Sequence, residues 1–240
     1  MIKSDIGLVG LAVMGENLAL NLEQKGYRVS LYNRLRENSP QAVDSFLANK
    51  GKNKHFIGTH SPKEFIESLK SPRKILLMIR AGHPVDEMIT TLLPFLKKGD
   101  TIIDGGNSDY RDTQRRENEL REKGIFFVGC GISGGEEGAL HGPSIMPGGS
   151  DEIKKEILPV LQNIAAHLDD GTPCCSWIGP DGSGHFVKTV HNGIEYGDMQ
   201  LIAEAYSLLN VLQKGDHEAT AQTFESWNKG CLLYTSDAAD

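Results

Sequence analysis

The sequence of 240 residues has no long apolar run and no repeated or low-complexity segment. A helix that spans a membrane needs about 18 or more consecutive apolar residues, and no such run is present. The first residues, "MIKSDIGLVG", lead directly into a strand-like segment without the apolar core of a signal peptide. We therefore expect a protein that neither spans a membrane nor binds one.

Cysteine is scarce, and the positions of the four cysteines argue against a metal site. Cys130, Cys174, Cys175 and Cys231 do not have metal-ligand spacing, and the adjacent pair is poorly placed to form a disulfide. This pattern predicts no metal site and a reducing, cytoplasmic setting. Positive charge is also in short supply: the formal net charge is −7, which argues against a nucleic acid or a membrane surface as the main partner.

The composition, with 39% hydrophobic and 24% charged residues, is typical of an ordinary globular protein. Apolar segments of strand length alternate with helical patterns along the first part of the chain. Continuous apolar strands that alternate with helices form parallel sheets covered on both faces. We therefore predict an α/β fold with a doubly wound, Rossmann-like, mostly parallel sheet. The expected strands are residues 6–10, 27–33, 74–79, 101–107 and 125–131.

The pattern changes after "CCSWIG" (174–179). One long helix is predicted from Asp181 to about Gln213, and "HEATAQTFESWNKG" predicts another. We therefore place a domain boundary near Gly179. Residues 1–179 form the expected cofactor-binding domain, and a helical second domain begins at residue 180.

The segment "GLAVMG" (10–15) has the spacing G-x-A-x-x-G of a dinucleotide-binding turn. Gly10 permits the tight turn, the small Ala12 lets backbone approach a pyrophosphate, and Gly15 allows close packing of helix on strand. The helix start also offers free N–H groups and a partial positive charge to phosphates. A glycine turn without a ligand is the alternative, but the position after the first strand favours a dinucleotide.

The end of the second expected strand favours NADP over NAD. In NAD-binding proteins an acidic residue there binds the ribose 2′-hydroxyl, and this sequence has none at that point. Asn33 and Arg34 stand there instead, and a guanidinium suits a 2′-phosphate. A solvent-exposed arginine in a loop is the alternative.

Two further glycine-rich segments, "DGGNSDYRDT" (104–113) and "GISGGEEGALHGPSIMPGG" (131–149), follow the fourth and fifth expected strands. Their glycines leave N–H groups open to an anionic ligand, and Asn107 and Ser133 add directed hydrogen bonds. Turns without any ligand fit the spacing equally well. Because His141 and His185 have no evident partners in the sequence, we expect both to be structural.

A polar stripe crosses the predicted long helix in "GHFVKTVHNGIEYGDMQ". The spacing puts five polar residues on one helix face, within an arc of roughly 140°. Such a stripe is either a solvated face or the lining of a pocket. Its residues are Lys188, His191, Asn192, Glu195 and Tyr196.

Together these segments resemble the 6-phosphogluconate dehydrogenase family, the decarboxylating enzymes of the oxidative pentose phosphate pathway. The resemblance runs from about residue 5 to 230, in the family's order and spacing. It rests on "GLAVMGENLALN", "YNR", "IRAG", "IIDGGNSDYRDT", "FVGCGISGGEEGALHGPSIMPGG" and "GHFVKTVHNGIEYGDMQLIAEAY". It implies an NADP-dependent oxidation of 6-phospho-D-gluconate to ribulose 5-phosphate and CO₂, carried out by a cytoplasmic homodimer.

The resemblance also implies roles for individual residues. The general base and the general acid fall on Lys188 and Glu195, with the lysine neutral because burial or a cationic neighbour lowers its pKa. The polar stripe then lines a pocket. Cofactor contacts are implied for Gly10, Leu11, Ala12, Val13, Met14, Gly15, Asn33, Arg34, Ile79, Arg80, Ala81 and Asn107. Substrate contacts are implied for Asn107, Ser133, Gly134, Gly135, His191, Asn192 and Tyr196.

The sequence departs from the family at two places. Leu35 stands where the family commonly has threonine, and "RENSPQ" differs from the usual continuation. The sequence therefore does not predict which residues besides Arg34 bind the 2′-phosphate. The family chain continues as a large helical domain that supplies basic residues for the substrate phosphate. Here "CLLYTSDAAD" (231–240) does not match the family. We therefore expect residues 180–230 to be the start of a truncated helical domain, and the chain alone to have little activity.

Two alternatives to this function remain. The first is a β-hydroxyacid dehydrogenase without decarboxylation, which shares the cofactor loop and a lysine on a helix. The segments "HNGIEYGD" and "SGGEEGA" favour the phosphogluconate enzyme over it. The second is a non-catalytic NADP-binding protein, which has no need of the pair Lys188 and Glu195.

Overall fold

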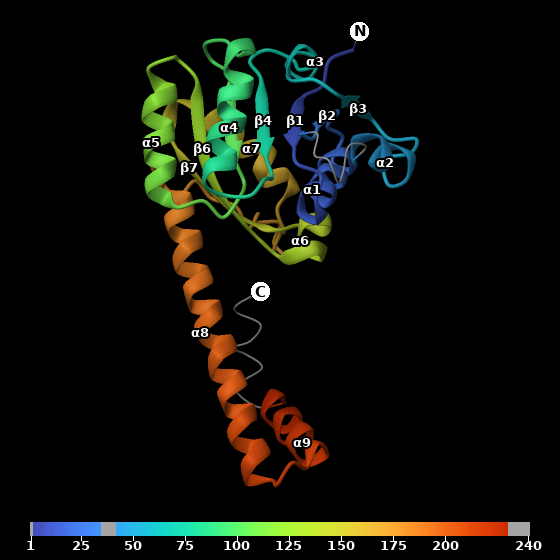
Figure 1. The fold of residues 1–240 in the computed structure, drawn as a ribbon, viewed down its shortest axis with the longest axis vertical. Coiled ribbons are helices and arrows are strands. Elements are labelled where there is room, and N and C mark those ends of the chain that lie inside the picture. The colour runs from blue at the N-terminus through green and yellow to red at the C-terminus, as the bar shows by residue number, and fades with distance from the viewer. Residues whose placement is uncertain (1, 35–41, 230–240) are drawn as a thin grey trace. The chain divides into compact units, whose positions relative to one another are not determined.

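The computed structural model describes residues 2–34 and 42–229 and divides into two compact units, residues 1–188 and residues 189–240 (Figure 1). Leu35, the segment "RENSPQ" and the tail "CLLYTSDAAD", where the sequence departs from the family, lie outside the described residues. So does Cys231.

The first unit is built on a sheet that, in the described part of the chain, has seven strands in the order β3-β2-β1-β4-β5-β6-β7. Neighbouring strands from β3 to β6 are parallel, and β6 and β7 are antiparallel. This confirms the predicted doubly wound, mostly parallel fold. The strands are β1 (Ile6–Val9), β2 (Val29–Tyr32), β3 (Phe56–Thr59), β4 (Lys74–Leu77), β5 (Thr101–Asp104), β6 (Phe126–Ser133) and β7 (Ser144–Gly149).

Helices cover both faces of the sheet (Figure 1), so the central strands β1 and β5 are buried at every residue. Successive strand residues point to opposite faces, so Leu8 packs in one hydrophobic cluster and Val9 in the other. The first cluster includes residues of α1 (Val13–Gln24), α2 (Ala42–Ala48) and α7 (Asp151–Ile164). The second includes residues of α3 (Pro62–Glu67), α4 (His83–Leu92) and α5 (Tyr110–Arg121).

Two details differ from the sequence-based expectation. The sequence pattern missed the edge strand β3, which is only half-buried over most of its length. It also missed β7: the segment expected as a glycine-rich loop after β6 contains the short helix α6 (Gly135–His141) and then β7.

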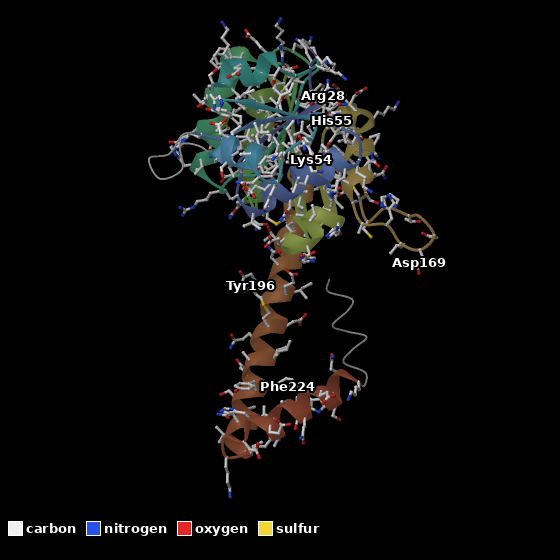
Figure 2. All side chains as sticks on the ribbon, turned by 90° about the vertical axis from the view of Figure 1, so that its right-hand side faces the viewer. Arg28, Lys54, His55, Asp169, Tyr196 and Phe224 are labelled. Atoms are coloured by element: carbon white, nitrogen blue, oxygen red, sulfur yellow. The ribbon has the colours of Figure 1, made fainter. Side chains whose placement is uncertain are left out.

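The second unit contains most of α8 (Ser183–Leu212) and α9 (His217–Asn228), which confirms the two predicted helices. The two helices contact each other through aromatic side chains, with the rings of Tyr206 and Phe224 6.4 Å apart. Figure 2 shows Phe224 on α9 and Tyr196 on α8. None of the helices within residues 2–34 and 42–229 is long and apolar enough to cross a membrane.

The first turn of α8 belongs to the first unit, which ends at Lys188. The reason is close packing: a Cβ on Gly184 would lie 2.3 Å from the carbonyl oxygens of Gly129 and Met146. The compact unit therefore extends beyond Gly179, and a domain boundary at Gly179 stays a prediction.

Candidate functional site

The glycine loop connects β1 to α1 at the carboxyl edge of the sheet. Gly10 has φ +102°, and a Cβ there would lie 2.3 Å from the carbonyl oxygen of Met78, so no larger residue fits. A Cβ on Gly15 would lie 1.9 Å from the carbonyl oxygen of Gly10. Ala12 is the N-cap residue of α1, and its side chain makes no capping hydrogen bond. The first N–H groups of the helix are thus left for an anion, as a pyrophosphate site requires. Leu11, Val13 and Met14 complete the loop.

The end of β2 is tied to this loop. The side-chain oxygen Oδ1 of Asn33 accepts a hydrogen bond of 3.1 Å from the backbone N–H of Leu11. The next residue, Arg34, has a half-exposed side chain, and its Nη1 donates to Oε2 of Glu87 on α4 at 2.5 Å. Glu87 could not be identified from the sequence, because no residue spacing connects α4 with the end of β2.

The turns after β4 and β5 lie against each other and against the glycine loop. A Cβ on Gly106 would lie 2.9 Å from the carbonyl oxygen of Ile79, and a Cβ on Gly10 would lie 2.8 Å from the Cγ2 atom of Ile79. Ile79 is followed by Arg80 and Ala81, and Asn107 is exposed in the turn after β5. The structure thus brings the loop 79–81 close to the glycine loop and to the turn that carries Asn107.

Three further residues expected to contact substrate, besides Asn107, lie in the first unit at the end of β6. Ser133 is the last residue of β6, and Gly134 is the N-cap residue before helix α6. Gly134 and Gly135 have positive φ angles of +137° and +59°. Glycine is favoured at both positions because larger residues rarely adopt this conformation.

Lys188 lies against β6 and is only 6% exposed. A Cβ on Gly131 would lie 2.6 Å from the Cβ of Lys188, and a Cβ on Gly129 would lie 2.9 Å from Nδ1 of His185. The alternating glycines of "FVGCGIS" therefore leave the space in which the first turn of α8 packs. Lys188, the first residue of the polar stripe, is not on a solvated face.

The other four residues of the stripe belong to the second unit. They continue along α8, which is unbroken from Ser183 to Leu212. His191, Asn192 and Glu195 are half-buried, and Tyr196 is exposed (Figure 2). Nδ1 of His191 lies 3.3 Å from Oε2 of Glu195. The roles expected for these residues stay predictions.

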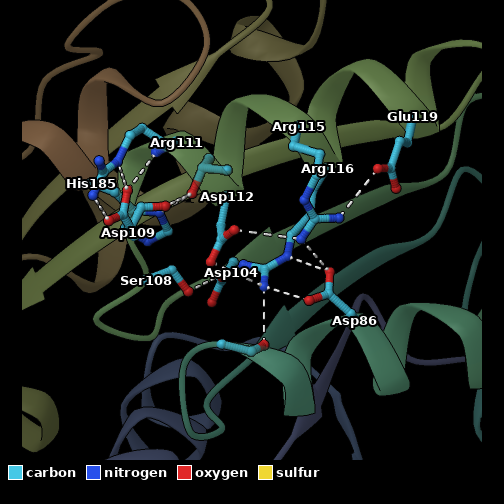
Figure 3. Close-up of polar contacts among 12 residues, drawn as sticks. Asp86, Asp104, Ser108, Asp109, Arg111, Asp112, Arg115, Arg116, Glu119 and His185 are labelled. Atoms are coloured by element: carbon cyan, nitrogen blue, oxygen red, sulfur yellow. Dashed lines mark hydrogen bonds and ion pairs between the residues drawn. The ribbon is translucent and has the colours of Figure 1, made fainter.

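A buried arginine that the sequence analysis missed connects the neighbouring loops (Figure 3). Arg116 of α5 is 1% exposed. Its Nε and Nη2 donate to the carboxylate of Asp86 at 2.8 and 3.0 Å, and Nη2 also donates to the carbonyl oxygen of Gly82 at 3.0 Å. These hydrogen bonds, with help from Arg115, lower the pKa of Asp86 to about 2. The first turn of α4 is therefore fixed to α5.

Arg116 also reaches the turn that follows β5. Its Nη1 lies 3.7 Å from Oδ2 of Asp104, which is fully buried. The Asp104 carboxylate in turn accepts hydrogen bonds from Ser108 Oγ at 2.7 Å and from the N–H of Gly106 at 3.1 Å. Asp104 thus shapes the turn that carries Asn107.

The two histidines expected to be structural, His185 and His141, each lie near a polar side chain, and their role stays a prediction. Nδ1 of the buried His185 lies 2.7 Å from Oγ1 of Thr113. Burial lowers the pKa of His185, while the nearby Asp104 carboxylate opposes that shift. The exposed His141 lies 3.5 Å from the carboxylate of Glu137, one helical turn earlier.

Neither a metal site nor a second site near the glycine loops is evident in the described part of the chain. Among the residues that the structure describes, no group of three or more His, Cys, Asp or Glu side chains could hold a metal ion. A cavity of about 270 Å³ is lined by Glu117, Arg121 and Phe126, among others. Phe126 is the first residue of β6, so this cavity lies at the amino end of that strand, whereas the glycine loops follow the carboxyl ends.

Comparison with known proteins identifies the family. A model of the NAD binding domain of 6-phosphogluconate dehydrogenase matches residues 5–179. The chain belongs to the 6-phosphogluconate dehydrogenase family. A model of the C-terminal domain of 6-phosphogluconate dehydrogenase matches residues 184–235.

Relatives in this family are similar over almost the whole chain. The decarboxylating 6-phosphogluconate dehydrogenase of Candida albicans is 54% identical over 96% of this chain and 44% of its own length. The NADP(+)-dependent enzyme of Bacillus subtilis is 54% identical over 97% of this chain and 48% of its own length. The chain therefore spans about half the length of the curated relatives it matches.

A solved structure in the same family has the same fold. The Plasmodium falciparum 6-phosphogluconate dehydrogenase superposes with a TM-score of 0.86 at 43% identity, over 95% of this chain and 48% of that one. That enzyme was studied in its apo form, with its cofactor NADP⁺ and with its substrate 6-phosphogluconate.

Proposed function

We propose that this chain is part of an NADP-dependent, decarboxylating 6-phosphogluconate dehydrogenase, which converts 6-phospho-D-gluconate to ribulose 5-phosphate and CO₂. The observation that carries the proposal is the buried Lys188, which packs on Gly131 of β6 in a chain of this family. A cytoplasmic homodimer is part of the same proposal. The free thiols of Cys130, Cys174 and Cys175 support the reducing setting.

The glycine loop fits a dinucleotide. Its backbone leaves no room for side chains at Gly10 and Gly15, and α1 starts without a side-chain cap. The pyrophosphate would lie on these N–H groups, and the guanidinium of Arg34 would bind the 2′-phosphate. Residues 79–81 and Asn107 would complete the contacts. When bound, NADP accepts the hydride from C3 of the sugar acid.

Lys188 would act first as a base and then as an acid. A neutral amine can take the proton of the C3 hydroxyl as the hydride leaves, and a buried position favours the neutral form. The protonated lysine can then polarise the new ketone, which assists loss of CO₂ from the β-keto acid. Ser133, Gly134 and Gly135 would hold the substrate from the β6 side.

Glu195 would act last, by protonating C1 of the enediol. It follows Lys188 by about two turns of the same helix, so the two groups can serve different atoms of the substrate. His191, which is paired with Glu195, would bind substrate together with Asn192 and Tyr196.

A chimera tests the proposal, because the chain spans only half of its relatives. Residues 1–229 are joined to the matching second half of the Bacillus subtilis relative, and formation of NADPH and of CO₂ is followed with 6-phosphogluconate. We expect the two products to form in equal amounts. NADPH without CO₂ would instead indicate a β-hydroxyacid dehydrogenase, and binding of NADP without reduction would indicate a non-catalytic protein.

Substitutions in the same chimera test the roles. Lys188→Ala should abolish both products, whereas Glu195→Gln should preserve hydride transfer better and slow the later protonation. Lys155→Ala, which removes an exposed lysine of α7, is the control and should leave both rates unchanged. NADPH formation by Lys188→Ala at the parental rate would overturn the assignment of the base.

A further inference from the structure

We propose that Glu87 of α4 is a specificity-determining residue that weakens the preference for NADP over NAD. This inference rests on the proposed function, because it assumes a nicotinamide cofactor on the glycine loop. The end of β2 lacks the acid that would bind the ribose of NAD, but the fold brings a carboxylate to the same place from α4. Cofactor choice then depends on the pair Arg34 and Glu87 rather than on Arg34 alone.

The first observation is the contact itself. Nη1 of Arg34 lies 2.5 Å from Oε2 of Glu87, so the guanidinium expected to bind the 2′-phosphate already binds a carboxylate. Nδ1 of His83 lies 3.4 Å from the other carboxylate oxygen. The hydrogen bond from Arg34 lowers the pKa of Glu87, so Glu87 carries a full negative charge at neutral pH.

The second observation is that Glu87 is held by a fixed element. Its neighbour Asp86 accepts two hydrogen bonds from the buried Arg116, which also binds Gly82 at the start of α4 (Figure 3). The carbonyl oxygen of Glu87 accepts a hydrogen bond of 2.7 Å from Oγ1 of Thr91. Helix α4 thus places the Glu87 carboxylate beside the end of β2, and Arg34 is the more exposed partner.

The two cofactors would experience this carboxylate differently. A 2′-phosphate that binds Arg34 must displace Glu87 or share the guanidinium with it, and the two negative groups repel each other. Because both side chains are partly exposed, solvent screens the effect, and we expect a roughly 3- to 10-fold weakening. The 2′-hydroxyl of NAD can instead donate a hydrogen bond to the same carboxylate.

The inference is tested by calorimetric titration of the chain with adenosine 2′,5′-bisphosphate and adenosine 5′-monophosphate. The difference between these ligands isolates the 2′-phosphate. Glu87→Gln should tighten binding of the bisphosphate about 3- to 10-fold and should not tighten binding of the monophosphate. The matched control is Glu225→Gln, which removes an acid from an exposed ion pair with the same N–O distance, 2.5 Å, on α9; it should change neither affinity.

A second variant separates a direct effect from a structural one. In an Arg34→Met background, Glu87→Gln should no longer tighten binding of the bisphosphate, because the competition for the guanidinium is gone. An unchanged ratio of the two affinities in Glu87→Gln, or the same gain with and without Arg34, overturns the inference alone. Failure of the parent chain to bind either ligand overturns the proposed function as well.

Discussion

At the scale of single residues, Arg116 organises more of the candidate site than any residue singled out from the sequence. It is buried together with Asp104 and binds Asp86 and Gly82. A buried charge contributes only when its partners are all present, and removing one partner leaves the others uncompensated. One buried side chain therefore fixes the surroundings of the loops expected to bind the cofactor.

Arg116→Met should destabilise the protein strongly. The change removes the guanidinium beside the buried Asp104 carboxylate, and it leaves Asp86 with Arg115 as its remaining partner. We therefore expect a loss of about 3–5 kcal/mol in the free energy of unfolding. Urea unfolding followed by circular dichroism measures this. The control is Arg115→Met: Arg115 is 44% exposed, and its loss should cost less than about 1 kcal/mol. Equal losses in the two variants would contradict the account.

His185 predicts a dependence of stability on pH. Burial lowers its pKa in the folded protein, whereas the unfolded chain takes up a proton near pH 6.5. The unfolded state therefore binds more protons below about pH 6.5, and the free energy of unfolding should fall as the pH drops from there towards the lowered pKa.

The contribution of His185 is the difference between the parent and His185→Gln, measured by urea unfolding from pH 7 to pH 5. That difference should shrink as the pH falls. His55→Gln serves as control, because the side chain of His55 is 73% exposed. A difference that stays constant with pH would show that His185 is not kept neutral by the fold.

At the scale of elements, the start of α8 depends on glycines in two elements. Gly129 and Gly131 of β6, and Gly184 of α8, leave no space for a methyl group. Gly193, further along the same helix, faces nothing within 4 Å. One helix therefore contains a glycine that the packing requires and a glycine that it does not.

Alanine substitutions should separate these two glycines. Gly184→Ala forces a methyl group against two carbonyl oxygens at 2.3 Å, which should cost at least about 1–3 kcal/mol. Gly193→Ala meets no obstacle and improves helix propensity, so it should stabilise the helix by about 0.5–1 kcal/mol. Thermal unfolding of both variants measures the contrast. Similar shifts in melting temperature would mean that α8 does not pack on β6 as described.

The strands that are continuous apolar runs could be predicted from the sequence. A strand that is defined by close packing, without such a run, could not. The sequence of β7 is "SIMPGG". Glycine is needed at position 148 because a Cβ there would lie 2.3 Å from Oγ of Ser183. The same limit applies to the site. The glycine loop is a local motif and was recognised, whereas Glu87 and Arg116 act through partners far away in the sequence, which no periodicity encodes.

At the scale of the whole molecule, the second unit leaves much apolar surface uncovered. Exposed apolar residues on α8 are Ile194, Met199, Leu201, Ile202, Leu208, Val211 and Leu212. A contiguous apolar surface in water promotes association. The curated relatives are about twice as long as this chain. The residues that correspond to their second halves are therefore not part of the described structure.

A protein made of these 240 residues alone should bind NADP but turn over 6-phosphogluconate barely or not at all. The cofactor unit has a full sheet with a core on both faces, whereas the residues expected to bind the substrate phosphate belong to the other half of the family chain. Calorimetry with NADP and absorbance of NADPH measure the two properties. The chain should also bind the dye ANS and self-associate, and the chimera should do neither. Turnover at the chimera's rate would show that the first half alone forms the site.

The boundary between the compact units falls inside α8, directly after Lys188. The proposed base therefore lies on one side of it and the proposed acid, Glu195, on the other. A recombination event that exchanged cofactor units at this boundary would pass on the lysine without the glutamate. Recombination between two relatives at this boundary would therefore combine the proposed base of one parent with the proposed acid of the other.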